Sequence, residues 1–190
     1  RIKALTQIQS SQNISSTNLD NADVISVAQE AGKSCIQVFF YRSKQNWGNQ
    51  SYFPLHDKSH AEEEVLASFI TQFYENKNVP AEILLNKKIK DLNLIKTALE
   101  KKEEKLISIK IPTKGNALKL SRMAEKNAKE ALTRKIFESE TNNKLLNEVA
   151  DKFKLDISPR IIEVYDNSHI QGSNSVGALI TFGSEGFIKK

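Results

Sequence analysis

The sequence IIEVYDNSHIQG, residues 161–172, decides the expected fold of the C-terminal part of the chain. It begins as an apolar run typical of a strand, and Asp166 stands near the end of that run. A polar loop containing Gly172 follows, and the apolar run from Val176 to Phe182 is expected to return as the next antiparallel strand. A strand that delivers a carboxylate in this way can open a metal-dependent hydrolytic site, because divalent cations take oxygen ligands and activate water.

Asp166 also has an ordinary alternative role. Asp-Asn-Ser is common turn chemistry, in which the Asp side chain accepts a backbone hydrogen bond. Two hard cations need several oxygen ligands, so further carboxylates would have to come from elsewhere. His169, taken alone, is more often a loop or core histidine than a catalyst. From these residues alone, both a metal ligand and a turn-capping role remain open for Asp166.

The flanking sequence extends the expected sheet. Arg160 to Tyr165 is predicted as its first strand, and Phe187 begins a third after the turn at residues 183–186. Residues 23–54 predict another three-stranded meander, with strands at 24–29, 35–42 and 50–53, a turn at 31–33 and a polar loop at 43–48. Apolar residues occupy both alternating sets of its middle strand, so that strand is expected to be covered on both faces, with Cys35 in the core.

Helices and parallel strands are expected between the two meanders. Ser59 and Glu62 have capping-box spacing, which predicts a helix over 60–75 with an apolar core stripe. A strand at 82–85, a helix at 92–100 and a strand at 106–111 predict parallel pairing with a right-handed crossover. The longest helix is expected over 116–137, and Thr141 is predicted to cap a separate helix that ends at Phe153.

Composition excludes several protein classes. The 190 residues are 39% hydrophobic and 27% charged, as in ordinary globular proteins. No apolar run approaches the roughly 20 residues that span a bilayer, and Arg1 to Ser10 lacks the layout of a signal peptide. The single cysteine has no partner for a disulfide. We therefore expect a cytoplasmic protein with no membrane segment.

Net charge and basic clusters suggest a polyanionic partner. The formal charge is +5, and basic residues gather on the expected long helix and at its entry. The DNA-binding candidates are Lys114, Lys119, Arg122, Lys126 and Lys129, with Arg134 and Lys135 further along. A solvated helix face with no DNA role remains open. Trp47, Tyr52 and Phe53 could stack on an unpaired base or simply pack against their neighbours.

Five sequence blocks resemble a known family. The segment from Tyr165 to Gly172 resembles the motif that opens the endonuclease domain of UvrC proteins: an aromatic residue, Asp, a variable residue, then Ser-His-x-Gln-Gly. Upstream blocks agree in the same order, namely residues 35–40, 48–54, 69–74 and 123–128. The resemblance covers nearly the whole chain.

The resemblance implies an α/β fold of three parts. Residues 1–17 resemble the tail of a UvrB-binding helical hairpin with its linker, and residues 18–154 resemble an α/β region with a mixed sheet. Residues 155–190 resemble the first strands of a ribonuclease H-like nuclease domain. The whole is expected to be arranged similarly to Argonaute proteins.

The resemblance also implies a chemistry. Asp166 would be the first ligand of Mg²⁺ or Mn²⁺, joined by aspartates and a histidine beyond Lys190. Ser168, His169 and Gln171 would shape the loop or support the site, while Asn167 occupies the variable position. The expected substrate is damaged double-stranded DNA, cut 5′ to the lesion after UvrA and UvrB have acted, with no small-molecule cofactor. The other incision belongs to an N-terminal domain of the family.

A second function class remains open. The region of residues 18–154 could be a non-catalytic module that grips DNA or a repair partner, with Asp166 serving no chemistry in this chain. Acidic residues on later strands of the native protein would favour the nuclease interpretation. A chain that ended at Lys190 would favour the binding module.

Overall fold

The computed structural model describes residues 19–170 and 173–188. Its contacts divide the chain into two units, residues 1–132 and residues 133–190. The UvrB-binding segment expected at residues 1–17 lies outside the described residues. The domain boundaries expected at residues 17 and 154 stay predictions.

The first unit is built on a mixed five-stranded sheet with the order β3-β2-β1-β4-β5. Strands β1 (Asn21–Glu30), β2 (Lys33–Arg42) and β3 (Gln45–Tyr52) form an antiparallel meander. Strand β4 (Glu82–Leu85) pairs in parallel with β1, and β5 (Ser108–Lys110) pairs in parallel with β4. Helices α2 (Glu62–Phe73) and α3 (Leu92–Glu103) join these strands. The expected mixed α/β fold and the parallel strand pair are confirmed.

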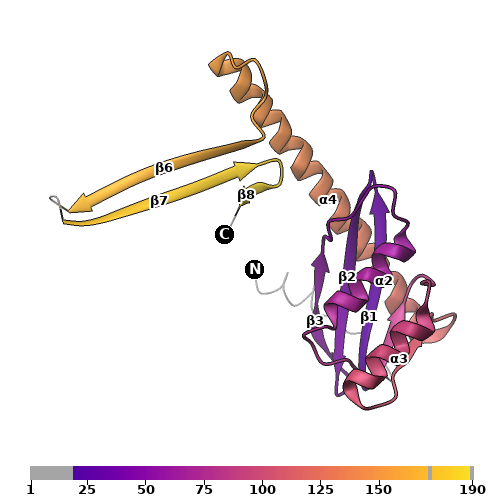
Figure 1. The fold of residues 1–190 in the computed structure, drawn as a ribbon. Helices are drawn as coiled ribbons and strands as arrows, with labels where there is room; N and C mark the ends of the chain where they lie inside the picture. Colours follow the sequence, from indigo (N-terminus) through magenta and orange to yellow (C-terminus); the bar gives the residue numbers. More distant parts are fainter. Residues whose placement is uncertain (1–18, 171–172, 189–190) are drawn as a thin grey trace, which may run out of the picture. The chain divides into compact units, whose positions relative to one another are not determined.

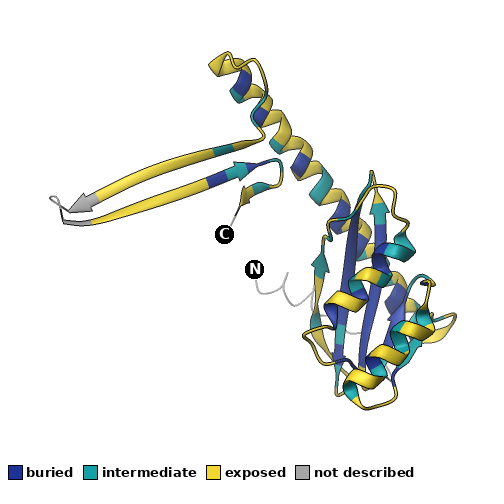
Figure 2. Cartoon of the chain, viewed as in Figure 1, coloured by how far each residue is buried: buried dark blue, intermediate teal, exposed yellow. Residues whose placement is uncertain are grey.

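Helices cover both faces of this sheet because its strands are apolar on both faces. Ile25 and Val27 of β1 belong to a core that includes residues of α2 and α3. The alternate residues Ala22 and Val24 belong to a second core with Leu120 of α4. Figures 1 and 2 show α2 and α3 on one face, α4 on the other, and buried strands between them. Strand β2 is mostly buried and Cys35 is fully buried, as expected.

Small residues let α4 (Gly115–Phe153) approach the sheet closely. Ala124 and Ala128 are fully buried, and the Ser26 hydroxyl donates a 3.1 Å hydrogen bond to the Ser121 carbonyl of the helix. The prediction of two helices separated before Thr141 is wrong, because α4 is continuous and the Thr141 hydroxyl donates to the Phe137 carbonyl one turn earlier. In the described part of the chain, no helix is long and apolar enough to span a membrane.

Two local predictions are also corrected. The polar loop expected over residues 43–48 is a tight hairpin turn, since Ser43 and Lys44 both have positive φ and β3 already begins at Gln45. The first helix does not start with a Ser59 cap. Ala61 is the residue before α2, and its N–H donates to Glu64 at 3.2 Å, while Ser59 donates to Asp57.

The second unit contains the later part of α4 and a three-stranded antiparallel sheet in the order β6-β7-β8. The strands are β6 (Ile161–Ile170), β7 (Ser173–Gly183) and β8 (Gly186–Ile188). The predicted antiparallel order is confirmed, but β6 and β7 are longer than expected. The turn between β7 and β8 contacts α4: the Lys135 ammonium lies 2.9 Å from the Glu185 carboxylate, and the Asn142 amide donates to the Ser184 carbonyl at 3.2 Å.

Candidate nuclease site and nucleic-acid interface

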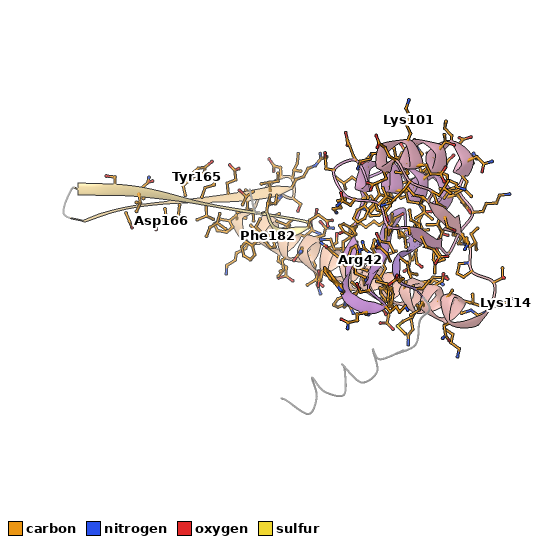
Figure 3. The ribbon with its side chains drawn as sticks, turned by 90° about the horizontal axis from the view of Figure 1, so that it is seen from below. Arg42, Lys101, Lys114, Tyr165, Asp166 and Phe182 are labelled. Atoms are coloured by element: carbon orange, nitrogen blue, oxygen red, sulfur yellow. The ribbon has the colours of Figure 1, made fainter. Side chains whose placement is uncertain are left out.

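Asp166 stands in the middle of a paired strand. It lies opposite Ala178 of β7 and is exposed to solvent. Because directly paired residues share a face of a sheet, Asp166 shares its face with the Val164–Ile180 pair and the Ser168–Val176 pair. Tyr165 projects from the opposite face (Figure 3). A mid-strand residue does not cap a turn, so this geometry removes the turn-capping alternative.

The carboxylate of Asp166 is available to a ligand. Among the described residues it has no hydrogen bond or ion pair with another side chain. By contrast, the neighbouring Tyr165 hydroxyl donates to Glu163 at 2.9 Å, and this hydrogen bond and the Glu163 charge raise the pKa of Tyr165. Asp166 therefore fits the oxygen ligands that hard divalent cations prefer.

Asp166 supplies only part of a metal site. Within residues 19–170 and 173–188, no group of three or more His, Cys, Asp or Glu side chains could hold a metal ion. Ser168 is exposed two residues along the same face of β6. The side chains of His169 and Gln171 lie outside the description. Any complete cation site at Asp166 takes further ligands from outside the described residues.

A second carboxylate on a first strand, Asp23 of β1, was missed by the sequence analysis. Asp23 is 1% exposed, and both of its oxygens are occupied. One accepts a 2.7 Å hydrogen bond from the Arg42 guanidinium, and the other accepts a 2.7 Å hydrogen bond from the Tyr74 hydroxyl. A lone Asp in an apolar strand, followed by an Arg at the end of the next strand, was the signal that could have found it.

The environment of Tyr74 keeps its hydroxyl protonated and hydrogen-bonded to Asp23. Burial, followed by the Asp23 charge and its hydrogen bond, raises the pKa of Tyr74 well above the ordinary value of 10.0, and the Arg42 charge opposes this only in part. The hydroxyl therefore stays protonated and donates to Asp23. Because both carboxylate oxygens are used, Asp23 has a structural role and does not offer a cation site.

Four of the five basic candidates form one surface on α4. Lys119, Arg122, Lys126 and Lys129 are exposed and follow each other at spacings of three or four residues, which places them on one side of a helix. We call this surface the basic stripe. It lies opposite the buried positions Leu120, Ala124 and Ala128 by the same helical spacing. Lys114 is exposed just before the helix begins.

Acidic neighbours dilute the basic stripe. Lys126 lies 3.7 Å from Glu130, and Lys129 lies 2.7 Å from Glu125. Exposed pairs one helical turn apart stabilise by only about 0.3–0.5 kcal/mol. Such pairs open at little cost, so the stripe can still meet phosphates.

The three aromatic candidates lie in different environments. The Tyr52 ring packs against Phe69 and Phe73, with ring centroids 5.3 Å and 5.4 Å apart. Trp47 is 73% exposed and lies beside the register shift between β2 and β3. Phe53 is 40% exposed. Packing therefore accounts for Tyr52, and Trp47 is the more accessible of the two exposed rings.

Comparison with protein families defines the class. Residues 21–135 match the family described as UvrC Ribonuclease H-like domain, and residues 150–190 match the UvrC RNAse H endonuclease domain. The first match alone covers more than half of the chain. The fold and the strand carrying Asp166 thus belong to ribonuclease H-like domains.

The chain belongs to the UvrC family. It is 46% identical to UvrABC system protein C of Ruegeria sp. (strain TM1040), 47% identical to that of Bartonella henselae and 48% identical to that of Rhodopseudomonas palustris (strain HaA2). Each alignment covers the whole chain and 30%, 29% and 27% of the respective relative. The chain therefore spans about 30% of the length of these relatives.

Proposed function

We propose that this chain is part of the nucleotide-excision-repair endonuclease subunit, which incises damaged DNA on the 5′ side of the lesion together with UvrA and UvrB. The observation that carries the proposal is Asp166, an exposed carboxylate with no side-chain partner among the described residues, on a strand of the segment that matches the endonuclease family. Because the substrate is chromosomal DNA, the protein acts in the cytoplasm.

Asp166 contributes a carboxylate oxygen to a divalent cation, Mg²⁺ or Mn²⁺. When bound, the cation lowers the pKa of the attacking water and stabilises the charge that develops on the phosphate. Strand pairing holds Asp166 in place, because it lies within the antiparallel ladder of β6 and β7, opposite Ala178. The roles proposed for Ser168, His169 and Gln171 are shaping of the loop or support of the ligand.

Incision by the full-length protein tests this function. We expect it to cut a lesion-containing duplex 5′ to the lesion in the presence of UvrA, UvrB and Mg²⁺. Chelation with EDTA should stop the cut, and added Mg²⁺ or Mn²⁺ should restore it. The 190-residue chain alone should not cut, since its described residues offer Asp166 without a cluster of further ligands. Incision that persists in EDTA would contradict the proposal.

The basic stripe is the proposed DNA contact of the first unit. Log affinity falls linearly with log salt concentration, and each phosphate neutralised by a cationic side chain makes the slope steeper by roughly 0.9. Replacement of both Arg122 and Lys126 by Gln in the full-length protein should therefore lower the slope of log affinity against log salt by about two. Lys101→Gln, at an exposed position of α3, removes one charge away from the stripe and serves as a control that should leave the slope unchanged. An unchanged slope in the double variant would leave the stripe as a solvated helix face.

A binding role for the first unit has its own support. The Asp23 carboxylate on its first strand is hydrogen-bonded by Arg42 and Tyr74, so both oxygens are occupied. The basic stripe, by contrast, is exposed. In this second candidate function, the first unit grips DNA or a repair partner without catalysis. Loss of DNA affinity in the stripe variant, with the cutting rate of saturated DNA unchanged, would favour it.

A further inference from the structure

A surface cavity lies at the base of the hairpin that carries Asp166. Its volume is about 390 Å³, and it is lined by residues of α4, of the connection to β6 and of the β7–β8 turn. The lining residues are Asn143, Leu146, Asn147, Ser158, Pro159, Arg160 and Ser184. All of them belong to the second unit.

The lining combines one cation with neutral hydrogen-bond donors. Asn143 and Asn147 stand one helical turn apart on α4, so their amides face the same side. Arg160 adds a guanidinium fork, and the two serines add hydroxyls. No carboxylate is present among the described residues that line the cavity. This donor set suits an anion with several acceptor oxygens.

These donors are not used within the described part of the protein. The side chains of Arg160, Asn143 and Asn147 make no hydrogen bond or ion pair with another described residue. The nearest acidic residue along the turn, Glu185, interacts with other residues. Its carboxylate lies 2.9 Å from the Lys135 ammonium and accepts a 3.3 Å hydrogen bond from the Ser139 hydroxyl. The positive charge of Arg160 therefore has no neutralising neighbour in the lining.

The rim of the cavity is held in place by its own backbone. A Cβ atom on Gly183 would lie 3.2 Å from the Arg160 carbonyl, which is a tight contact between the end of β7 and the residue before β6. The Ser184 carbonyl is anchored by the Asn142 amide at 3.2 Å. The backbones of Arg160 and Ser184 are thus held close together at the rim of the cavity.

We propose that this cavity binds a backbone phosphate of the DNA that the protein incises. The ligand class follows from the donors: a guanidinium with amides and hydroxyls is the set that proteins use for nucleic-acid phosphates. Asp166 lies six positions after Arg160 along an extended segment, which is about 20 Å at roughly 3.3 Å per residue. The anchored phosphate would therefore lie in the DNA flanking the scissile phosphate and not at the scissile phosphate itself. This proposal rests on the proposed function for the identity of the ligand.

Binding of a short duplex by the full-length protein tests the cavity. Arg160→Gln should lower the slope of log affinity against log salt concentration by about 0.9, which corresponds to the loss of one phosphate contact. Lys152→Gln, which removes the same charge from an exposed position of α4 outside the cavity, should leave the slope unchanged. Arg160→Lys keeps the charge and should keep most of the slope. Equal slopes for Arg160→Gln and Lys152→Gln would overturn the proposal.

Single neutral methylphosphonate linkages locate the contact. Among linkages placed one at a time through the DNA flanking the cut, one should weaken binding by the wild type and have no further effect on Arg160→Gln. The same weakening in both proteins would overturn the proposal. An Arg160→Gln protein that unfolds at lower urea but binds DNA with the wild-type slope would also overturn it, showing that the cavity is filled by another part of the protein. Because these experiments measure binding and not cutting, they test the cavity whether or not the protein incises DNA.

Discussion

Asp166→Asn is expected to abolish the 5′ incision by the full-length protein, with a loss of roughly a thousandfold in rate. The amide keeps the size of the side chain but removes the negative charge that a divalent cation needs. Several kilocalories per mole of transition-state stabilisation depend on a well-held cation, and each 1.36 kcal/mol is about tenfold in rate. Because Asp166 is exposed and makes no hydrogen bond or ion pair with the side chain of a described residue, folding should be unaffected. The measurement is the rate of 5′ cutting of a lesion-containing duplex.

Two controls make the Asp166 result specific. Asn167→Ala changes the adjacent exposed residue, which lies on the opposite face of the hairpin, and should cut normally. The incision on the other side of the lesion should persist in Asp166→Asn, because the resemblance to the family implies that a different domain makes it. A 5′ cut at the wild-type rate in Asp166→Asn would show that Asp166 is not a ligand.

Arg42→Ala is expected to lower the free energy of unfolding of the chain by about 3 kcal/mol, the lower end of the range for breaking a buried ion pair. The substitution leaves the Asp23 carboxylate, which is 1% exposed, without its charged partner. The lower end applies because Arg42 is 27% exposed and water can partly replace it. Tyr74→Phe removes only a hydrogen bond to the same charge and should cost about 1.5–3 kcal/mol.

Urea unfolding of the 190-residue chain measures both effects. Arg122→Ala, an exposed arginine of the basic stripe, is the matched control and should stay within about 0.5 kcal/mol of the wild type. An Arg42→Ala protein as stable as this control would mean that the Asp23 carboxylate is not stabilised by Arg42. The hydrogen bonds from Arg42 and Tyr74 would then no longer explain why Asp23 offers no cation site.

Much of the secondary structure could be predicted from local pattern. The strand at residues 82–85 is predicted with its observed bounds, and the strand order of both meanders is predicted, though not all strand ends, because strand alternation and turn residues act between near neighbours. The break expected before Thr141 was wrong for a related reason. Threonine favours a helix start in a sequence, but its hydroxyl can equally bond to the preceding turn inside a continuous helix.

The sequence by itself determined the family, the mixed α/β class and Asp166 as the first candidate ligand, since these depend on residues close together in the chain. Only the tertiary structure decided which carboxylate is available. The Asp23 carboxylate accepts hydrogen bonds from Arg42, 19 residues away, and from Tyr74, 51 residues away. Asp166 has no such partner among the described residues. It likewise brought Asn143, Arg160 and Ser184 to one cavity. Such neighbours are set by strand register and by helix packing on the sheet, which bring distant residues together and which no local pattern specifies.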